Sequence, residues 1–558
     1  MKKLSLAFVL LIGQLAFFSV FAQQPLEQIL KEEASRNLEK MSKEPIPAYY
    51  ISYRIYETTS ESANSSFGEL TGSYNGKSRR LHVKVRVGSP QLDNTHEIKE
   101  NNAWEYTRYE AFDLPLENNE EAIRLVLWNK TDKLYKEAVQ RFLKVKANVA
   151  VKVAAEDKSP DFSAEEREQY SEKPISYASL KFNKKEYENK LKSYTAIFKE
   201  NKDIVSGDAY FETQLFRYYF ADTEGAAISQ NDVAFRISLS ATTIADDGMI
   251  LPLYQSYYAQ SVKDLPADKV VMNDAKEISR MLTNLKKAPV ADTYTGPAIL
   301  TAEATGVFFH EFFGHRLEGA RMKQESDAQT FKKKIGEKVL PEDMSLYFDP
   351  SIKKYKNILL SGSYVFDDEG VRGQKVNVVE KGVLKSFLMS RTPIDSFPHS
   401  NGHGRGMIYL NPVTRQSNMI IESSRPYSNE ELRAMLKEEL KKQGKPYGYL
   451  FSKVSGGFTQ TSRIMPNAFN VTPLIVHRIY AEDKPDELVR GVNMIGTPLS
   501  MFSQIAACGK EIDVFNGYCG AESGSVPVSC VAPAVYVKMV ETQKQAKSQT
   551  QPPILARP

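Results

Sequence analysis

Residues 298–319 read AILTAEATGVFFHEFFGHRLEG and carry the strongest structural signal in the chain. The opening residues, Ala298–Leu300, are apolar and predict a short strand. Thr301 follows as a favourable N-cap residue, and Glu303 in the first turn suits the positive end of the helix dipole. The stretch therefore predicts a strand that passes directly into a helix, which ends near Gly319.

Two histidines and a glutamate interrupt this apolar helix. Zinc prefers imidazole and thiolate ligands, so His310 and His315 are candidate ligands and Glu311 is a candidate general base. The familiar zinc-peptidase helix reads H-E-x-x-H, with its histidines four positions apart, whereas here the interval is five. At about 100° per residue, that interval turns the two imidazoles about 140° apart on a regular helix. We therefore expect a bulge, a kink at Gly314 or the end of the helix between Glu311 and His315.

The alternative is an ordinary core helix in which the histidines are incidental. Four phenylalanines accompany them: Phe308, Phe309, Phe312 and Phe313. Burying two imidazoles and a carboxylate on so apolar a helix costs free energy unless they have partners. A metal ion is such a partner, and we therefore favour metal binding over the incidental interpretation.

A catalytic zinc site usually has three protein ligands, so a third residue is needed. Glu318 is close by construction, three residues after His315, whereas Cys519 lies in the turn-like segment GYCG. The chain has an odd number of cysteines, which leaves at least one thiol outside any disulfide: Cys508, Cys519 and Cys530. His399 and His403 form a second H-x-x-x-H in a glycine-rich loop, for which we favour exposed histidines on a flexible backbone. The other histidines lack a ligand pattern: His82, His96 and His477.

The N terminus differs from the rest of the chain. Lys2 and Lys3 precede an apolar run, from Leu4 to Phe21, that ends at Ala22. This order is typical of a signal peptide, and we expect cleavage after Ala22 and export to the periplasm. The remainder is close to neutral, because removing two lysines from 73 basic residues leaves 71 against 69 acidic ones. Such a balance gives no electrostatic footprint for nucleic acid, and no other stretch is apolar enough to span a membrane.

The sequence predicts an α+β protein of two domains. Residues 23–290 mix helical and strand patterns and form an N-terminal α/β domain, which includes a charged insertion at about 130–200. Residues 291–540 are rich in strand patterns and form a C-terminal domain of mainly antiparallel strands. The HEFFGH helix lies near the junction of the two domains. Residues 541–558 are rich in Gln, Lys, Ser and Pro and are expected to be disordered.

Local signals add detail to the C-terminal domain. Lys381-Gly382 separates two strand patterns and indicates a hairpin. Ser428 with Glu431 forms a capping-box pattern that begins a further helix, and Gly444 suits the end of that helix.

Several segments, in order, resemble the TldD/PmbA family of metallopeptidases. HEFFGHRLEG is similar to the family's H-E-x-x-x-H-x-x-E-G signature and is the most specific of them. The others are DDEGVRGQ at 367–374, VEKGVLKSFLMSR, NGHGRG, SGGFTQTS, LVRGVNMIG at 488–496 and GYCGAESGSVPVSCVAPAVYV. They lie between residues 290 and 540, whereas the first half resembles the family only in its general α/β pattern.

The resemblance implies a set of site residues: His310, His315 and Cys519 as zinc ligands, Glu311 as general base and Glu318 as a residue that supports a ligand. It gives Cys508 and Cys530 no ligand role. The family also implies a two-part fold and a dimer, either a homodimer or a pair with a related subunit that lacks the metal motif.

The function implied is a zinc-dependent peptidase acting on unfolded or flexible peptides, in which a metal-activated water attacks the scissile carbonyl with Glu311 as base. An extended peptide would add a strand to a sheet edge. We expect glycine-rich segments to line its channel: His403, Gly404 and Arg405 in one, Gly456 and Gly457 in the other. The alternative is a non-catalytic peptide-binding subunit of a TldD/TldE-like heterodimer, which the retained metal motif disfavours. A cysteine-nucleophile hydrolase built on Cys519 is a third hypothesis, which activity after chelation would support.

Overall fold

The computed structural model describes residues 25–98, 111–151, 157–324, 327, 329–459, 469–496, 501–545 and 553–555. The predicted signal peptide and its cleavage site after Ala22 lie outside these residues. Within them, every helix is too short or too polar to cross a membrane.

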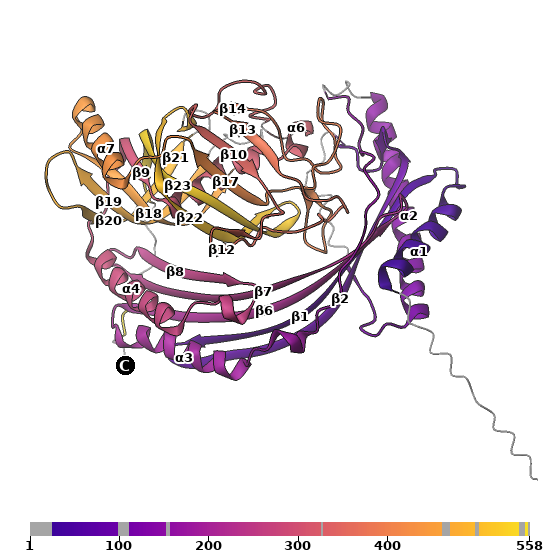
Figure 1. The fold of residues 1–558 in the computed structure, drawn as a ribbon, viewed down its shortest axis with the longest axis horizontal. Coiled ribbons are helices and arrows are strands. Elements are labelled where there is room, and N and C mark those ends of the chain that lie inside the picture. The colour runs from indigo at the N-terminus through magenta and orange to yellow at the C-terminus, as the bar shows by residue number, and fades with distance from the viewer. Residues whose placement is uncertain are drawn as a thin grey trace, which may run out of the picture.

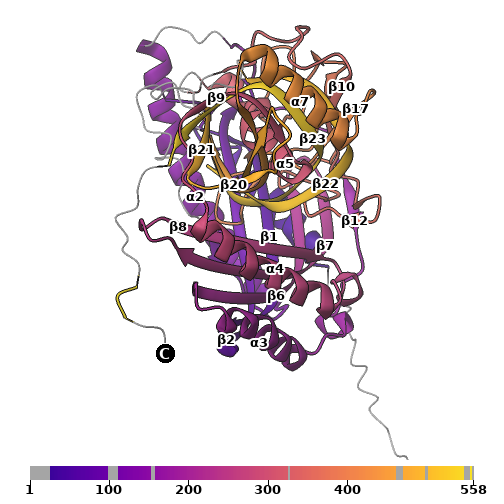
Figure 2. The same cartoon turned by 90° about the vertical axis from the view of Figure 1, so that its left-hand side faces the viewer.

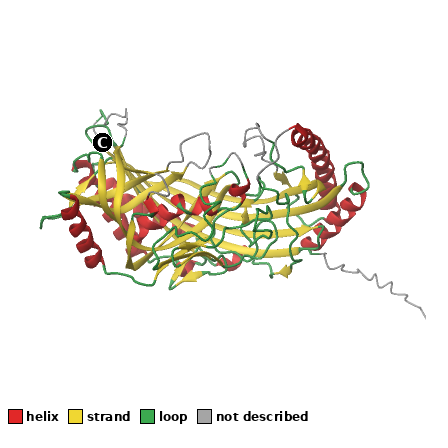
Figure 3. Ribbon diagram, turned by 90° about the horizontal axis from the view of Figure 1, so that it is seen from above, coloured by secondary structure: helices red, strands yellow, loops and turns green. Residues whose placement is uncertain are grey.

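The N-terminal unit is a curved sheet with helices on its outer side and at one end (Figure 1). Its helices are α1 (Leu26–Met41), α2 (Glu120–Val151), α3 (Lys184–Glu200) and α4 (Asp268–Lys287), with short 3-10 turns η2 (Tyr177–Leu180) and η3 (Val262–Asp264). Its strands are β1 (Ala48–Ser66), β2 (Glu69–Ser89), β3 (Leu92–Asp93), β4 (Ala111–Asp113), β5 (Gln169–Ser171), β6 (Ile204–Asp222), β7 (Ala227–Ile244) and β8 (Ile250–Ala259). From above, the long strands run along the length of the molecule (Figure 3).

Alternating apolar residues explain why this sheet has one helix-covered face. The strands run in the order β3-β2-β1-β6-β7, with β8 paired to β7. On β6, Phe211 is buried against Leu191 and Phe198 of α3, and Phe235 of β7 joins the same cluster. Side chains at alternate strand positions point to opposite faces, so the intervening polar residues face the C-terminal unit.

In the described part of the chain, the C-terminal unit is built from 15 strands, β9 to β23. They are β9 (Tyr294–Leu300), β10 (Met344–Phe348), β11 (Lys354–Tyr355), β12 (Ile358–Leu359), β13 (Val376–Glu380), β14 (Val383–Leu384), β15 (Gly404–Arg405), β16 (Val413–Thr414), β17 (Asn418–Ser423), β18 (Tyr447–Thr459), β19 (Phe469–Tyr480), β20 (Glu487–Val489), β21 (Val492–Gly496), β22 (Ile505–Ala521) and β23 (Gly524–Lys544). The helices are α5 (Ala302–Phe312), the 3-10 helix η4 (Gly314–Leu317), α6 (Ala320–Lys323) and α7 (Asn429–Gln443).

The expected HEFFGH helix is α5, and it lies inside a ring of strands. The pairings run from β9 to β18, β19, β21 and β23 and return to β9. Figure 2 shows this ring around α5, which also contacts β22. The phenylalanines of α5 are fully buried within it, so the helix that carries His310 and leads to His315 is the core of the unit.

The structure confirms the α+β class, and several local predictions agree with it. Thr301 caps α5 by accepting a hydrogen bond from the backbone N–H of Ala304. Ser428 and Glu431 form the predicted capping box, and Gly444 ends α7 in the left-handed conformation. Most pairs in the larger sheet are antiparallel, but β17 with β23 and β18 with β9 are parallel.

One boundary differs from the prediction. The disordered tail was expected from residue 541, whereas β23 continues to Lys544 and pairs with β9 and β21. The composition of Glu541–Lys544 is polar, but two neighbouring strands supply partners for its backbone, and these pairings outweigh the low propensity.

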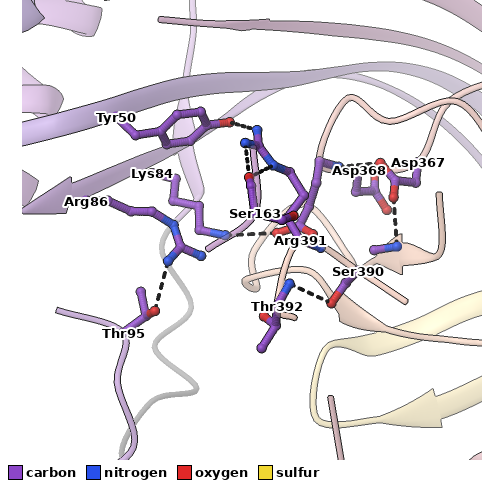
Figure 4. A network of polar contacts seen from close by, with 12 residues as sticks. Tyr50, Lys84, Arg86, Thr95, Ser163, Asp367, Asp368, Ser390, Arg391 and Thr392 are labelled. Carbon is purple, nitrogen blue, oxygen red and sulfur yellow. Dashed lines mark hydrogen bonds and ion pairs between the residues drawn. The ribbon is translucent and has the colours of Figure 1, made fainter. Parts of the chain in front are cut away.

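The segment DDEG joins the C-terminal unit to the N-terminal sheet (Figure 4). Asp368 pairs with Arg54 of β1 at 3.3 Å, and Glu369 pairs with Lys84 of β2 at 3.0 Å. Arg391 adds a fully buried guanidinium whose partners belong to the N-terminal unit: Ser163, Tyr50, Asp222 and Glu224. The motif therefore holds the two units together with paired, buried charges.

Candidate metal centre

The helix end resolves the unusual spacing of the two histidines. The α-helix stops at Phe312, and a 3-10 turn begins at Gly314, so His315 does not continue the helical rotation of His310. The expected distortion is therefore a helix end rather than a bulge. Arg316 stabilises this end, because its Nη1 atom donates to the carbonyl oxygens of Glu311 at 3.1 Å and Phe312 at 2.9 Å.

Gly314 packs closely against Gln416 at this turn. A Cβ atom at this position would lie 2.0 Å from Oε1 of Gln416. The same glutamine donates from Nε2 to the carbonyl oxygen of His310 at 3.4 Å. A residue larger than glycine would displace the side chain that contacts the helix end.

Three of the predicted ligands come together. The rings of His310 and His315 have centroids 5.1 Å apart. Sγ of Cys519 lies 3.3 Å from Nε2 of His315. One ligand atom from each of the three residues lies within 4.8 Å of the others, and the three are 5%, 5% and 2% exposed.

Strand β22 brings Cys519 to the helix from 204 residues away along the chain. It pairs with β23 up to Ala521 and Gly524, so Cys519 stands opposite Val526 near the turn of this hairpin. Cys519 packs against Val526 and Val528 in a small apolar cluster. Long-range strand pairing, rather than local sequence, therefore supplies the third candidate ligand.

Of the three cysteines, Cys519 is the one whose surroundings favour a thiolate. Burial acts to raise the pKa of the Cys519 thiol, but His315, His310 and Arg415 outweigh it and hold the pKa well below its usual value. Burial raises the pKa of Cys508 to about 12 and also raises that of Cys530. Because thiolates bind metal, Cys519 is the cysteine suited to be a ligand.

Glu318 orients His315. Nδ1 of His315 lies 3.2 Å from Oε2 of Glu318, and since a carboxylate only accepts hydrogen bonds, Nδ1 carries the proton. Arg321 donates from Nε to the same oxygen at 2.8 Å. Nε2 is then the ring nitrogen that faces Sγ of Cys519, and a metal ion bound there would replace its proton.

These residues fit zinc. A zinc–nitrogen distance of about 2.0–2.1 Å and a zinc–sulfur distance of about 2.3 Å place these two tetrahedral ligand atoms about 3.5–3.6 Å apart, close to the 3.3 Å between Sγ of Cys519 and Nε2 of His315. Two imidazoles and a thiolate are also the donors that zinc prefers over the oxygen ligands of magnesium or calcium.

Glu311 lies beside the metal group and close to the chain of β18. Its side chain is half-buried, unlike the two histidines. A Cβ atom at Gly457 would lie 2.3 Å from Cγ of Glu311. Gly457 is exposed and Gly456 has a positive φ of 140°, so a partly open stretch of β18 runs past the candidate base.

The expectation that His403, Gly404 and Arg405 line a channel is wrong. His403 is 0% exposed, and its Nε2 lies 3.0 Å from Oγ of Ser417. Arg405 is buried and donates to the carbonyl oxygens of Gln416 and Pro527. The glycines of this loop serve tight packing instead of exposure: Gly404 lies against Glu369, and its N–H donates to Asp367.

The other candidate histidines stand apart from the metal group. His399 is exposed near Glu165, and with His403 enclosed the second H-x-x-x-H forms no metal group in the described part of the chain. His477 lies in β19, and His82 is buried in β2. His96 contacts Asp161 at 2.8 Å.

A polar run that the sequence analysis passed over supports the site. Residues 414–418 read TRQSN, and all five are at most 1% exposed. Arg415 contacts the backbone of Cys519 at 2.5 Å, and Gln416 contacts that of His310. The available signal was a run of polar residues leading directly into the buried strand β17.

The C-terminal unit matches a known family of sequences. Residues 293–544 match the profile of the PmbA/TldA metallopeptidase C-terminal domain. A metalloprotease of Archaeoglobus fulgidus is 30% identical over 261 residues, which are 47% of this chain and 56% of that protein. A zinc metalloprotease TldD homolog of Saccharolobus solfataricus is 24% identical over 346 residues, 60% of this chain and 70% of that protein.

The match to these relatives is partial in length. The chain spans little more than half of the Archaeoglobus protein, and 52% of a metalloprotease of Methanocaldococcus jannaschii that is 29% identical over 260 residues.

Solved structures share the fold over nearly the whole chain. TldE from Thermococcus kodakarensis superposes with a TM-score of 0.60 and 17% identity, covering 92% of this chain and 99% of the other. A putative modulator of DNA gyrase from Thermotoga maritima gives a TM-score of 0.59 and 16% identity over similar shares, 92% and 99%. At these identities the likeness concerns the fold alone.

Proposed function

The chain belongs to the TldD/PmbA family, and from that premise we propose that it is a zinc-dependent peptidase acting on unfolded or flexible peptides. One observation carries the proposal: His310, His315 and Cys519 bring their ligand atoms within 4.8 Å of one another, with Glu311 next to His310 on the same helix. The names of the relatives support a metallopeptidase, and the donor set supports zinc.

Three side chains of this protein would hold the ion: His310 and His315 through imidazole nitrogen and Cys519 through sulfur. A zinc ion bound there supplies a Lewis acid that makes water more acidic and polarises a carbonyl group. Glu318 keeps the proton of His315 on Nδ1, so that Nε2 stays available as a ligand atom.

Glu311 is the proposed base. Its carboxylate oxygen takes a proton from the attacking water and later delivers that proton to the nitrogen of the leaving amine. The half-buried position suits this role, because the carboxylate reaches substrate while the helix N-terminal to it is fixed in the core. Arg316 holds the backbone at Glu311 and so limits the movement of its side chain.

We propose that the peptide lies in extended form along β18 at Gly456 and Gly457. Gly457 has no side chain to separate a peptide from Glu311. Backbone hydrogen bonds along a strand would recognise extended chains of varied sequence, which suits unfolded substrates.

The partner and compartment are also proposals. The shared fold with TldE supports a TldD/TldE-type assembly, either a homodimer or a heterodimer with a related subunit. The lysine-led apolar N terminus supports export to the periplasm. The alternative, a non-catalytic peptide-binding subunit, predicts that purified protein holds no stoichiometric metal.

The test is cleavage of an unfolded peptide by the purified protein, measured with its metal content before and after chelation. The proposal predicts cleavage that disappears with the metal and returns when zinc is added. Metal-free protein that still binds peptide would favour the non-catalytic subunit, and cleavage that survives chelation would favour a cysteine nucleophile.

A further inference from the structure

Arg415 is a fully enclosed arginine at the hairpin that carries Cys519. Its Nη2 atom donates to the carbonyl oxygen of Cys519 at 2.5 Å. Its Nη1 atom donates to Oγ of Ser523 and to the carbonyl oxygen of Gly524, each at 2.8 Å. One guanidinium therefore ties the end of β22 to the start of β23 across the turn.

The same side chain faces the histidine half of the site. Nε of Arg415 lies 3.7 Å from Oε1 of Glu318, and among the described residues both atoms lack a hydrogen-bond partner. The other oxygen of Glu318 holds Nδ1 of His315. Arg415 thus lies between Glu318, whose carboxylate orients His315, and the backbone of Cys519.

The next residue extends this arrangement to the third ligand. Gln416 donates to the carbonyl oxygen of His310 and packs against Gly314. Arg415 and Gln416 therefore contact the backbone of Cys519 and of His310, respectively. Arg415 also lies near Glu318, the carboxylate that orients His315.

We propose that Arg415 is a positioning residue, which fixes the distance between Cys519 and His315 and so sets the affinity for the metal. The inference rests on the proposed function, because it assumes that these residues bind a metal. A planar guanidinium donates in fixed directions to several acceptors at once, and lysine does not reproduce this geometry. Residues that support metal ligands in this way typically contribute about 10- to 100-fold in metal affinity.

Arg391 offers a matched control. It is buried to the same degree, 1% exposed against 0% for Arg415. Its partners are carboxylates and oxygens of the N-terminal unit, and none is a metal-ligand candidate or Glu318. Replacing either arginine removes a buried charge with its hydrogen bonds, but only Arg415 connects to the ligands.

The experiment compares Arg415→Met with Arg391→Met in the full-length protein. Zinc affinity is measured by competition with a chromophoric chelator, and Co²⁺ is substituted to record the thiolate-to-cobalt charge-transfer band. For Arg415→Met we expect about 10- to 100-fold weaker binding and a diminished or displaced band. For Arg391→Met we expect wild-type affinity and an unchanged band, with thermal stability lowered in both variants.

Wild-type affinity and an unchanged band in Arg415→Met would overturn the inference, as would an equal loss in Arg391→Met. If the methionine variants do not fold, Arg415→Lys and Arg391→Lys provide the same comparison while keeping the charge. We expect weaker metal binding in Arg415→Lys only, and equal affinities would overturn the inference. Failure of the wild-type protein to bind any metal would instead refute the proposed function.

Discussion

Gly457→Ala tests whether Glu311 must occupy its present position. Gly457 has no positive φ, so alanine suits its backbone. The added Cβ atom would lie 2.3 Å from Cγ of Glu311, 3.0 Å from Cδ and 3.1 Å from Cβ. Ordinary contacts between such atoms begin at 3.4 Å, so the carboxylate has to move by about 1 Å.

A displacement of about 1 Å at a catalytic group can cost about 100-fold in rate, or about 2.7 kcal/mol in the activation free energy. We therefore expect kcat for cleavage of an unfolded peptide to fall by that order. The zinc content should stay at the wild-type level, because the three atoms nearest the added Cβ all belong to Glu311 and none to a candidate ligand. Gly76→Ala is a matched control, since its Cβ would meet only Oγ of Ser60, at 3.4 Å.

The assay is steady-state cleavage of a fluorogenic unfolded peptide, with zinc measured on the same samples. Unchanged kcat in Gly457→Ala would refute the role assigned to the position of Glu311. Loss of zinc in that variant, or a similar loss of activity in Gly76→Ala, would show that the effect is structural.

Three further predictions concern the base, the buried loop and the contact between the two units. Glu311→Gln should keep its zinc and lose about 10²- to 10⁴-fold in kcat, and full activity would contradict its role as base. Burial lowers the pKa of His403 to about 3, below its value of about 6.5 in an unfolded chain. The unfolded state therefore binds the proton first, and stability present above pH 6.5 is lost as the pH falls toward 3. This linkage lowers the unfolding free energy of the wild-type protein by about 2 kcal/mol between pH 7 and pH 5, and His403→Gln should remove that part of the decrease. Urea unfolding at the two pH values measures the decrease, and an equal decrease in both proteins would exclude His403 as its source. Arg54→Met removes the cation paired with Asp368, which keeps its hydrogen bonds from Tyr56 and Gly406. It should lower the unfolding free energy by about 3–5 kcal/mol, whereas a change below about 1 kcal/mol would contradict the importance of this contact.

The predictions that succeeded rest on local physics. The cap at Thr301, the capping box at Ser428 and the arrest of α5 before His315 each depend on residues within one or two turns. A regular helix would point His310 and His315 about 140° apart, so it has to end or distort before both can bind one ion. That argument needs the sequence alone.

The predictions that failed concern burial and distant partners. The loop NGHGRG has the composition of an exposed segment, yet His403 is enclosed because Ser417 and Asn401 satisfy its ring nitrogens. Arg415 and Gln416 attracted no attention because their partners lie about 100 residues away in sequence. Residue spacing alone left both Glu318 and Cys519 as candidates for the third ligand, and the long β22–β23 hairpin brings the thiol to His315.

The most direct test of the central claim is X-ray absorption at the zinc edge of the purified, zinc-loaded protein. The account predicts one ion per chain with one sulfur ligand at about 2.3 Å and two imidazole nitrogens at about 2.0–2.1 Å, and loss of the sulfur in Cys519→Ser. A zinc ion without a sulfur ligand, or protein that binds no zinc, would contradict it.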